Sequence, residues 1–299
     1  MPKESFEQFV RRQKEKLDKA KKMIREVKKD LEDLEKKIEE FIEKPLKDLK
    51  RLWEENEEEI EKKDDWVTAF SFLFSLPFPE TSPSFLERIS NKFLKEFDWK
   101  KFEKKGFLRG GLGLFLSAFL KKNIESYISS QKEKGIKEEN IKPIEVHLKV
   151  KELPIPLWCL GYQNPKKLHL IIEGDCGEFT GEKTQGGKII VEGDCEGCWT
   201  GRYMQGGKII VKGSCRDWTG EKMQGGKIII EGNCGRGTGI CMKGGELDIK
   251  GKVVSFERSS TFSPNNQGTI IWKGIKIWEN GNWTKEGKEM WERGEIPVE

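Results

Sequence analysis

The feature of this 299-residue sequence that most constrains its fold is a glycine-rich segment that repeats four times at nearly constant spacing. Each unit begins with a short β-branched run and continues into glycine-rich turns. None has the hydrophobic periodicity of a helix, which excludes a βαβ sheet. Stacked units would pair each strand with neighbours about 4.8 Å away, so we expect a right-handed parallel β-helix over residues 143–278. The units read IIEGDCGEFTGEKTQGGK, IVEGDCEGCWTGRYMQGGK, IVKGSCRDWTGEKMQGGK and IIEGNCGRGTGICMKGGE.

Stacking would place equivalent positions of successive coils side by side, so the repeat predicts ladders of similar side chains. The equivalent cysteines, separated by 19, 20 and 19 residues, are Cys176, Cys195, Cys215 and Cys234. The other predicted ladders are Thr180, Thr200, Thr219 and Thr238; Met204, Met223 and Met242; and Phe179, Trp199 and Trp218. The aromatic ladder suits either packing against the helical region or the stacking of bases or sugars.

Two rows of charged residues would also form, one on each side of the short strands. The first row contains Lys188, Lys208 and Lys227, followed by Glu246. Its lysines either bind an anion or are ordinary solvated surface groups. In the second row, opposite charges at Glu192/Lys212 and at Glu231/Lys250 would favour the correct register. The complete second row is Glu173, Glu192, Lys212, Glu231 and Lys250.

The glycine spacing resembles a known family of repeats. The motifs that carry the resemblance are Gly174-x-x-Gly177-x-x-x-Gly181 and Gly232-x-x-Gly235-x-x-x-Gly239, each followed by a Gly-Gly pair. Over about residues 165–251 they resemble the β-helix in the C-terminal domain of the large chain of glutamate synthase and, equally, the glycine-repeat β-helix component of formylmethanofuran dehydrogenase. The resemblance implies a structural spacer in the first case and a noncatalytic component beside metal-bearing partners in the second. The third unit departs from the pattern, since Arg216 replaces the middle glycine.

The first 64 residues have the heptad pattern of a long, highly charged helix of coiled-coil type. The expected association seam includes Val10, Leu17, Ile24, Leu31, Leu34 and Ile38. Such a narrow seam needs a partner, which is either another part of the same chain, a second copy or a different protein. Pro45 interrupts the pattern and allows either a bent continuous helix or a helical hairpin.

Two further segments complete the predicted organisation. Residues 65–142 are rich in aromatic and aliphatic residues around a Pro-rich turn and read as a small helical domain, with one helix near 112–128. Residues 279–299 are expected to cover the last coil, because an open β-helix end would invite edge pairing. The predicted fold class is therefore α+β by segments, with a long helix and a helical domain followed by the β-helix.

Charge and hydropathy limit the classes of partner. The 55 Lys and Arg residues nearly balance 51 Asp and Glu residues, so the net charge of +4 predicts no nucleic-acid partner held by bulk charge. Abundant Lys and Glu are typical of hyperthermophile proteins. No apolar run reaches the ~20 residues of a transmembrane helix, and the N-terminus lacks a secretory signal. We expect no transmembrane segment and a cytoplasmic protein with reduced thiols; no small-molecule ligand is indicated.

The cysteines are the residues that could carry chemistry. Cysteine as a compact side chain that fills the coil interior is the simplest interpretation, and it implies no cofactor. The alternatives are zinc or an iron–sulfur cluster held by Cys176, Cys195, Cys198, Cys215 and Cys234, or a redox pair at Cys195 and Cys198. No catalytic triad, P-loop or HExxH motif is present.

These observations lead to two functional hypotheses. The first is a noncatalytic scaffold or assembly protein that uses the β-helix and the helical arm to associate with itself or with a protein partner. The second is an accessory subunit of a redox complex like formylmethanofuran dehydrogenase or glutamate synthase, in which the cysteine ladder has a metal or redox role. A third interpretation is a polymerising filament protein.

Overall fold

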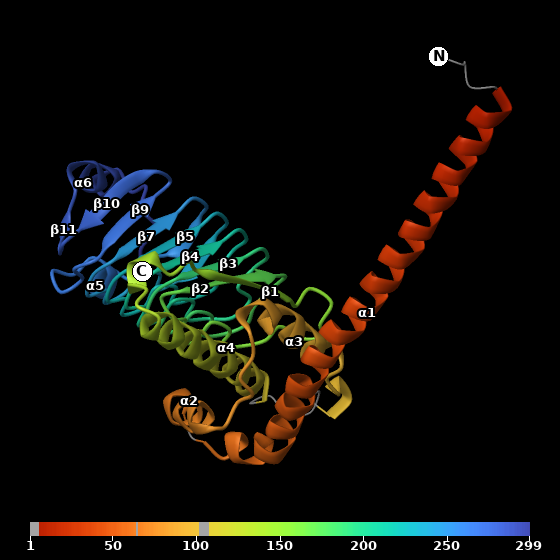
Figure 1. Ribbon diagram of the computed structural model, residues 1–299. Coiled ribbons are helices and arrows are strands. Elements are labelled where there is room, and N and C mark those ends of the chain that lie inside the picture. Colours follow the sequence, from red (N-terminus) through yellow and green to blue (C-terminus); the bar gives the residue numbers. More distant parts are fainter. Residues whose placement is uncertain (1–5, 64, 102–107) are drawn as a thin grey trace. The chain divides into compact units, whose positions relative to one another are not determined.

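The computed structural model describes residues 6–63, 65–101 and 108–299 and contains two compact units, Met1–Lys47 and Asp48–Glu299. Helix α1, Phe6–Glu61, is one continuous helix of 56 residues with Pro45 inside it (Figure 1). The chain therefore does not form a helical hairpin at this point. Proline removes one backbone donor, and the remaining hydrogen bonds of the long helix continue on both sides of it.

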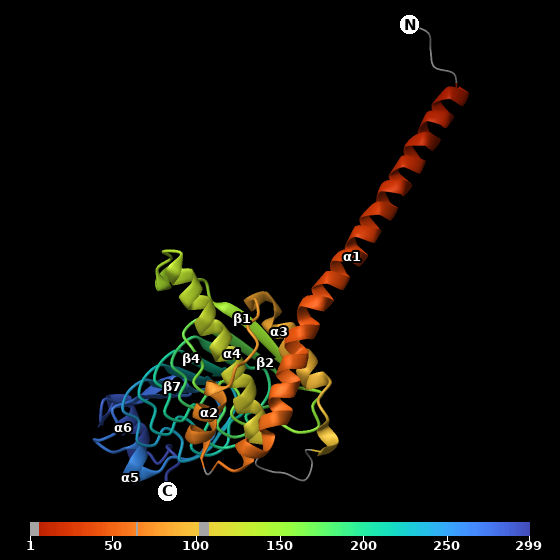
Figure 2. The same cartoon turned by 60° about the horizontal axis from the view of Figure 1, so that its bottom comes forward.

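The second unit begins with helices that form an aromatic core. In this core the Trp53 and Phe115 ring centroids are 5.2 Å apart, and those of Phe78 and Phe115 are 5.0 Å apart. Figure 2 shows helix α2 (Trp66–Ser75) beside helix α4 (Leu108–Glu133). Helix α4 is longer than the helix predicted near residues 112–128. The elements of this part are α2 (Trp66–Ser75), α3 (Pro83–Lys95), a 3-10 turn (Trp99–Lys101), α4 (Leu108–Glu133) and a second 3-10 turn (Glu138–Asn140).

The rest of the second unit is a parallel β-solenoid of about five turns, so the predicted fold class is confirmed (Figure 1). Its main sheet has the strand order β1-β2-β3-β4-β5-β7-β9-β10-β11, and the first seven of these strands are parallel. The strands are β1 (Ile144–Lys149), β2 (Leu168–Glu173), β3 (Lys188–Val191), β4 (Lys208–Val211), β5 (Lys227–Ile230), β7 (Glu246–Ile249), β9 (Thr269–Trp272), β10 (Ile275–Glu279) and β11 (Asn282–Trp283). The remaining elements are β6 (Cys234–Arg236), which pairs with β8 (Val253–Ser255), and helices α5 (Arg258–Thr261) and α6 (Lys285–Glu292).

The tight corners of the coils explain why the repeat is rich in glycine. Gly201 has a φ of +67°, and a Cβ placed on it would lie 2.4 Å from Cδ1 of the buried Ile228. An L-residue there would combine an unfavourable backbone conformation with a steric clash. Close packing also explains a glycine of the helical region, because a Cβ on Gly113 of α4 would lie 1.8 Å from the Trp158 carbonyl oxygen.

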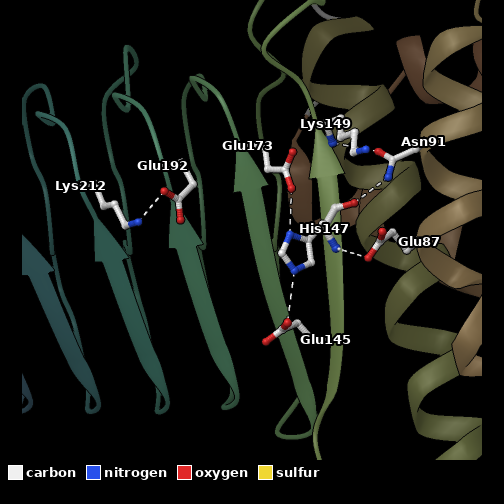
Figure 3. A network of polar contacts seen from close by, with 8 residues as sticks. All are labelled: Glu87, Asn91, Glu145, His147, Lys149, Glu173, Glu192 and Lys212. Atoms are coloured by element: carbon white, nitrogen blue, oxygen red, sulfur yellow. Dashed lines mark hydrogen bonds and ion pairs between the residues drawn. The ribbon is translucent and has the colours of Figure 1, made fainter.

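Both edges of the main sheet are covered. At the first edge, α3 supplies polar side chains to the backbone of β1: Glu87 Oε2 accepts from His147 N at 3.1 Å (Figure 3). Asn91 Nδ2 donates to the His147 carbonyl at 2.7 Å, and its Oδ1 accepts from Lys149 N at 2.8 Å. At the other edge, β10 and β11 turn the sheet antiparallel and α6 packs on them. Covered edges suppress the edge-to-edge pairing that an open solenoid would invite.

Candidate functional site

The cysteine ladder lies inside the solenoid. Isolated parallel β-bridges of the backbone pair Cys176 with Cys195 and Cys195 with Cys215, and Cys234 follows in β6. The thiols themselves are free. All four side chains are buried. Burial raises the pKa of Cys176, Cys215 and Cys234, whereas hydrogen bonds from the two flanking thiols lower the pKa of Cys195. The row is therefore a packed line of thiols.

A line of thiols does not fit a four-thiolate zinc or iron–sulfur site. Strand spacing of about 4.8 Å separates the first and last cysteines of the row by roughly 14 Å, whereas one zinc ion needs four sulfurs at about 2.3 Å. Within the described ranges, no group of three or more His, Cys, Asp or Glu residues is placed to hold a metal ion. The second cysteine of the C-x-x-C pair, Cys198, is half-buried, and burial raises its pKa.

The threonine and methionine ladders also point inward. All four threonines are buried, and Thr180, Thr219 and Thr238 donate their hydroxyls to the backbone carbonyl three residues earlier, at 2.9 to 3.1 Å. Met204, Met223 and Met242 are completely buried. These side chains stabilise the corners and fill the interior, so they offer no surface to a ligand.

The aromatic ladder is a continuous stack over three coils. The ring centroids of Phe179 and Trp199 are 4.9 Å apart with an interplanar angle of 3°, and those of Trp199 and Trp218 are 5.0 Å apart at 14°. A Cβ on Gly237, the next equivalent position, would lie 2.6 Å from the Trp218 ring. The Trp218 end of the stack is thus closed by the backbone of Gly237, which leaves no slot for a further ring at that end.

A buried polar row that the sequence analysis missed lies between the coil corners. Equivalent positions of four successive coils hold Tyr162, Glu182, Arg202 and Glu221. Tyr162, Glu182 and Glu221 are buried, and Arg202 Nε is 3.1 Å from Glu221 Oε2. Among the described residues, Glu182 Oε2 has no hydrogen-bond partner. Burial raises the pKa of Glu182 to about 7, against the opposing charges of Lys183 and Arg202. Alignment of position 182 with Arg202 and Glu221 could have found this row, because charged side chains recur one residue after the corner glycine.

The outward side of the main sheet presents the two charged rows. The three lysines lie side by side, since Lys188 pairs in register with Lys208, and Lys208 with Lys227. Lys227 also forms an ion pair with Glu246. In the second row Lys212 Nζ lies 2.5 Å from Glu192 Oε2 (Figure 3). The expected Glu231/Lys250 pair is replaced by a local one, because Lys250 Nζ is 2.7 Å from Asp248 Oδ2.

A histidine continues this network onto the first strand. His147 Nδ1 is 2.9 Å from Glu173 Oε1, and its Nε2 is 3.2 Å from Glu145 Oε1 (Figure 3). Hydrogen bonds to Glu173 and Glu145 raise the pKa of His147. The imidazole of His147 therefore links β1 to β2 through its contact with Glu173, and the two carboxylates favour its charged form.

The association seam of α1 differs from every solenoid ladder because its apolar side chains are exposed. Ile24, Val27, Leu31 and Leu34 are between 52% and 57% exposed, and Phe41 is 66% exposed. Ile38 is half-buried. Val10 and Leu17 belong to the helix, but their side chains lie outside the described residues. An apolar stripe of this regularity on one face of a helix is typical of a coiled-coil seam.

No family model, curated protein or solved structure gives a significant match to this chain. Within the described ranges, no helix combines the length and apolar character required to cross a bilayer. Among the side chains that the structure describes, the seam of α1 is the longest row of exposed apolar residues.

Proposed function

We propose that this protein is a noncatalytic assembly protein whose copies associate through the seam of α1. The observation that carries the proposal is the exposure of five of the six seam residues from Ile24 to Phe41. Exposed apolar residues in a 4-3 repeat gain free energy when a second helix buries them. The repeat resembles noncatalytic domains, which supports a role in assembly over a role in catalysis.

A second copy is the partner that the charges beside the seam favour, provided that the two helices run antiparallel. In heptad terms Ile24, Leu31 and Ile38 occupy a, and Val27, Leu34 and Phe41 occupy d. In a parallel, in-register pair the flanking g and e positions would bring Asp30 against Glu35 and Lys16 against Lys21. Like charges there oppose pairing.

An antiparallel pair places e positions against e positions. The e position Glu35 then faces Lys28, Lys21 or Lys14 in three central registers, because these lysines occupy three of the other e positions. The register that pairs Glu35 with Lys28 is favoured, since the other two also set Lys28 against a lysine. Glu35, which meets Asp30 in a parallel pair, therefore meets a lysine in an antiparallel one. We accordingly expect an antiparallel helical dimer.

Sedimentation velocity of the full chain tests this proposal. Leu31→Glu puts a charge at the centre of the seam and should lower the association constant at least tenfold, since an unpaired charge in such an interface is costly. Lys29→Glu, at an f position on the outer face of the same helix, is the matched control and should leave association unchanged. A wild-type protein that is monomeric up to about 100 μM, or a Leu31→Glu protein that associates like wild type, would overturn the proposal.

A further inference from the structure

The outward face of the main sheet has a regular composition that extends over six parallel strands. Along its middle, register pairing aligns four half-buried isoleucines from β2 to β5. His147 precedes them on β1 and Asp248 follows them on β7. The middle row is therefore an apolar strip with a polar residue at each end, and its isoleucines are Ile171, Ile190, Ile210 and Ile229.

Two rows flank this strip, because residues two positions before and after the middle residue point to the same side of a strand. We call this face, with its three rows, the sheet face. The row on the N-terminal side is Glu145, His169, Lys188, Lys208, Lys227 and Glu246. The row on the C-terminal side is Lys149, Glu173, Glu192, Lys212, Glu231 and Lys250.

We propose that the sheet face binds the same face of a second copy, about a twofold axis that runs along the isoleucine strip. This inference goes beyond the proposed seam, because it assigns a second and independent association surface. A rotation about that axis leaves each coil opposite the same coil of the second copy. It also exchanges the two flanks, so that the N-terminal row of one copy faces the C-terminal row of the other.

Opposite charges meet across this arrangement in four of the six coils. In β3, Lys188 of one copy faces Glu192 of the second; in β5, Lys227 faces Glu231. The same opposition occurs in β1 (Glu145 with Lys149) and β7 (Glu246 with Lys250). In β2, Glu173 faces His169, whose pKa is lowered by burial and by Lys188, so this coil adds a polar contact. In the flanking rows only β4 brings like charges together, Lys208 against Lys212. In the middle row, which lies on the axis, His147 and Asp248 each face their own equivalent in the second copy, and Lys250 already pairs with Asp248 within each copy. Opposite charges directly across an interface favour pairing and fix its register.

The alternative twofold axis, parallel to the strands, gives the opposite result. That rotation reverses the order of the coils and places each flank on itself, so a pair centred on β4 would set Lys208 against Lys208 and Lys188 against Lys227. Repulsion between these lysines opposes such a pair. The charge pattern therefore selects one orientation of a face-to-face dimer, which a scattered surface pattern would not do.

The contact should be weak and sensitive to salt. Four isoleucines form a small apolar centre compared with a standard interface of about 1,600 Å² in total. Some flanking charges already have partners within one copy, as in the 2.5 Å contact between Lys212 and Glu192. These charges are partly neutralised before association, so the ion pairs between copies contribute less. Exposed charge pairs lose most of their attraction at high ionic strength.

Two matched substitutions in the same row test the proposal, and they should have opposite effects. Lys188→Glu replaces an attractive contact with Glu192 of the second copy by a repulsive one. Lys208→Glu does the reverse at the one like-charged coil, because the new carboxylate would face Lys212. Within one copy each new carboxylate lies beside at least one lysine of its own row, so neither substitution should harm folding.

The measurement is sedimentation equilibrium of the full chain carrying Leu31→Glu, at low and at high salt. This background removes the seam, so that failure of one proposal is distinguishable from failure of the other. In low salt we expect Lys188→Glu to weaken dimerisation about tenfold and Lys208→Glu to strengthen it several-fold, since each change acts at two symmetry-related contacts. The double substitution Lys188→Glu/Glu192→Lys should restore dimerisation, because it exchanges the two charges at both contacts. Circular dichroism melts verify folding.

The following results would overturn the proposal. If both lysine substitutions weaken association, the row binds a different anionic surface. If neither changes it, or if the background protein is monomeric in low salt up to about 1 mM, the sheet face does not pair.

Discussion

The solenoid and the N-terminal part of α1 use similar apolar side chains in opposite ways. In the solenoid, each isoleucine that faces inward is covered by the equivalent residue of the next coil, as Ile209 is by Ile189 and Ile228. On α1 the seam residues are covered on one side only, by their own helix, and most remain more than half exposed. Substitutions in the solenoid should therefore change the free energy of unfolding, whereas substitutions in the seam should change association.

The largest expected effect is at a solenoid corner. Gly201→Val would place a β-branched side chain at a φ of +67° and against Ile228, so we expect a loss of at least about 4 kcal/mol in the free energy of unfolding. Gly135→Ala is the matched control: it also has a positive φ, but no atom lies within 4 Å of its added Cβ, and about 1 kcal/mol should be lost. Urea unfolding followed by circular dichroism measures both. Equal losses would mean that packing at the corner is unimportant.

The next comparison pairs an inward isoleucine with a seam isoleucine. Ile209→Ala removes a fully buried side chain and should cost about 3 kcal/mol of stability. Ile24→Ala, at a residue 57% exposed, should leave the unfolding of the solenoid unchanged and weaken association instead. Urea unfolding and sedimentation velocity on both variants separate the two effects. A large loss of solenoid stability in Ile24→Ala would contradict the distinction between the regions.

A smaller effect concerns the pH dependence of the solenoid. Burial raises the pKa of Glu182 from 4.5 to about 7, so the folded state disfavours its charged form. The stability contribution of Glu182 is therefore greatest below pH 4.5 and is lost as the pH rises through 7. Glu182→Gln should match wild type at pH 4 and exceed it by roughly 2 kcal/mol at pH 8. A constant difference between the two proteins from pH 4 to pH 8 would show that Glu182 titrates normally.

The smallest expected effect concerns the tie between the first two coils. Glu173 and Glu145 raise the pKa of His147, and Glu87 adds a third negative charge nearby. The resulting stability is present below pH 6.5 and is lost as the pH rises through the folded-state pKa. Because the imidazole is about one third exposed, only a few tenths of a kcal/mol should be involved. The melting temperature of His147→Gln should lack this pH dependence. Melting temperatures identical to those of wild type at every pH would show that His147 does not stabilise the first two coils.

The stacked coils were predictable because four units of similar sequence follow one another at nearly constant spacing. Equivalent cysteines at 19- and 20-residue spacing fix which strand residues lie side by side, and the strands pair in the register that this spacing implies. The two charged rows of the sheet face follow from the same spacing. The isoleucine strip between them was not apparent, because runs such as Ile189–Ile190–Val191 are apolar on both sides and do not show which residues point outward. That distinction requires the burial of alternate residues in the folded coil.

Other features depend on contacts between distant segments. Glu87 and Asn91 reach the backbone of β1 from about 60 residues away, and no local pattern indicates that a helix would cover this edge. Lys250 was expected to pair with Glu231 in the neighbouring coil. Its bond to Asp248 in the same strand satisfies the charge locally, so the simple rule of opposite charges across strands was insufficient.

The chain reverses direction after β9, so the segment that ends the solenoid is separate from the coils that set its length. Two-residue turns at Lys273–Gly274 and Asn280–Gly281, all with positive φ, convert the last parallel strand into an antiparallel hairpin. The terminating segment contacts only the final coils, so duplication of one 19-residue unit should lengthen the rod by a single layer of about 4.8 Å without a new terminator. Coil number is thus a quantity that evolution or an engineer can vary in integer steps.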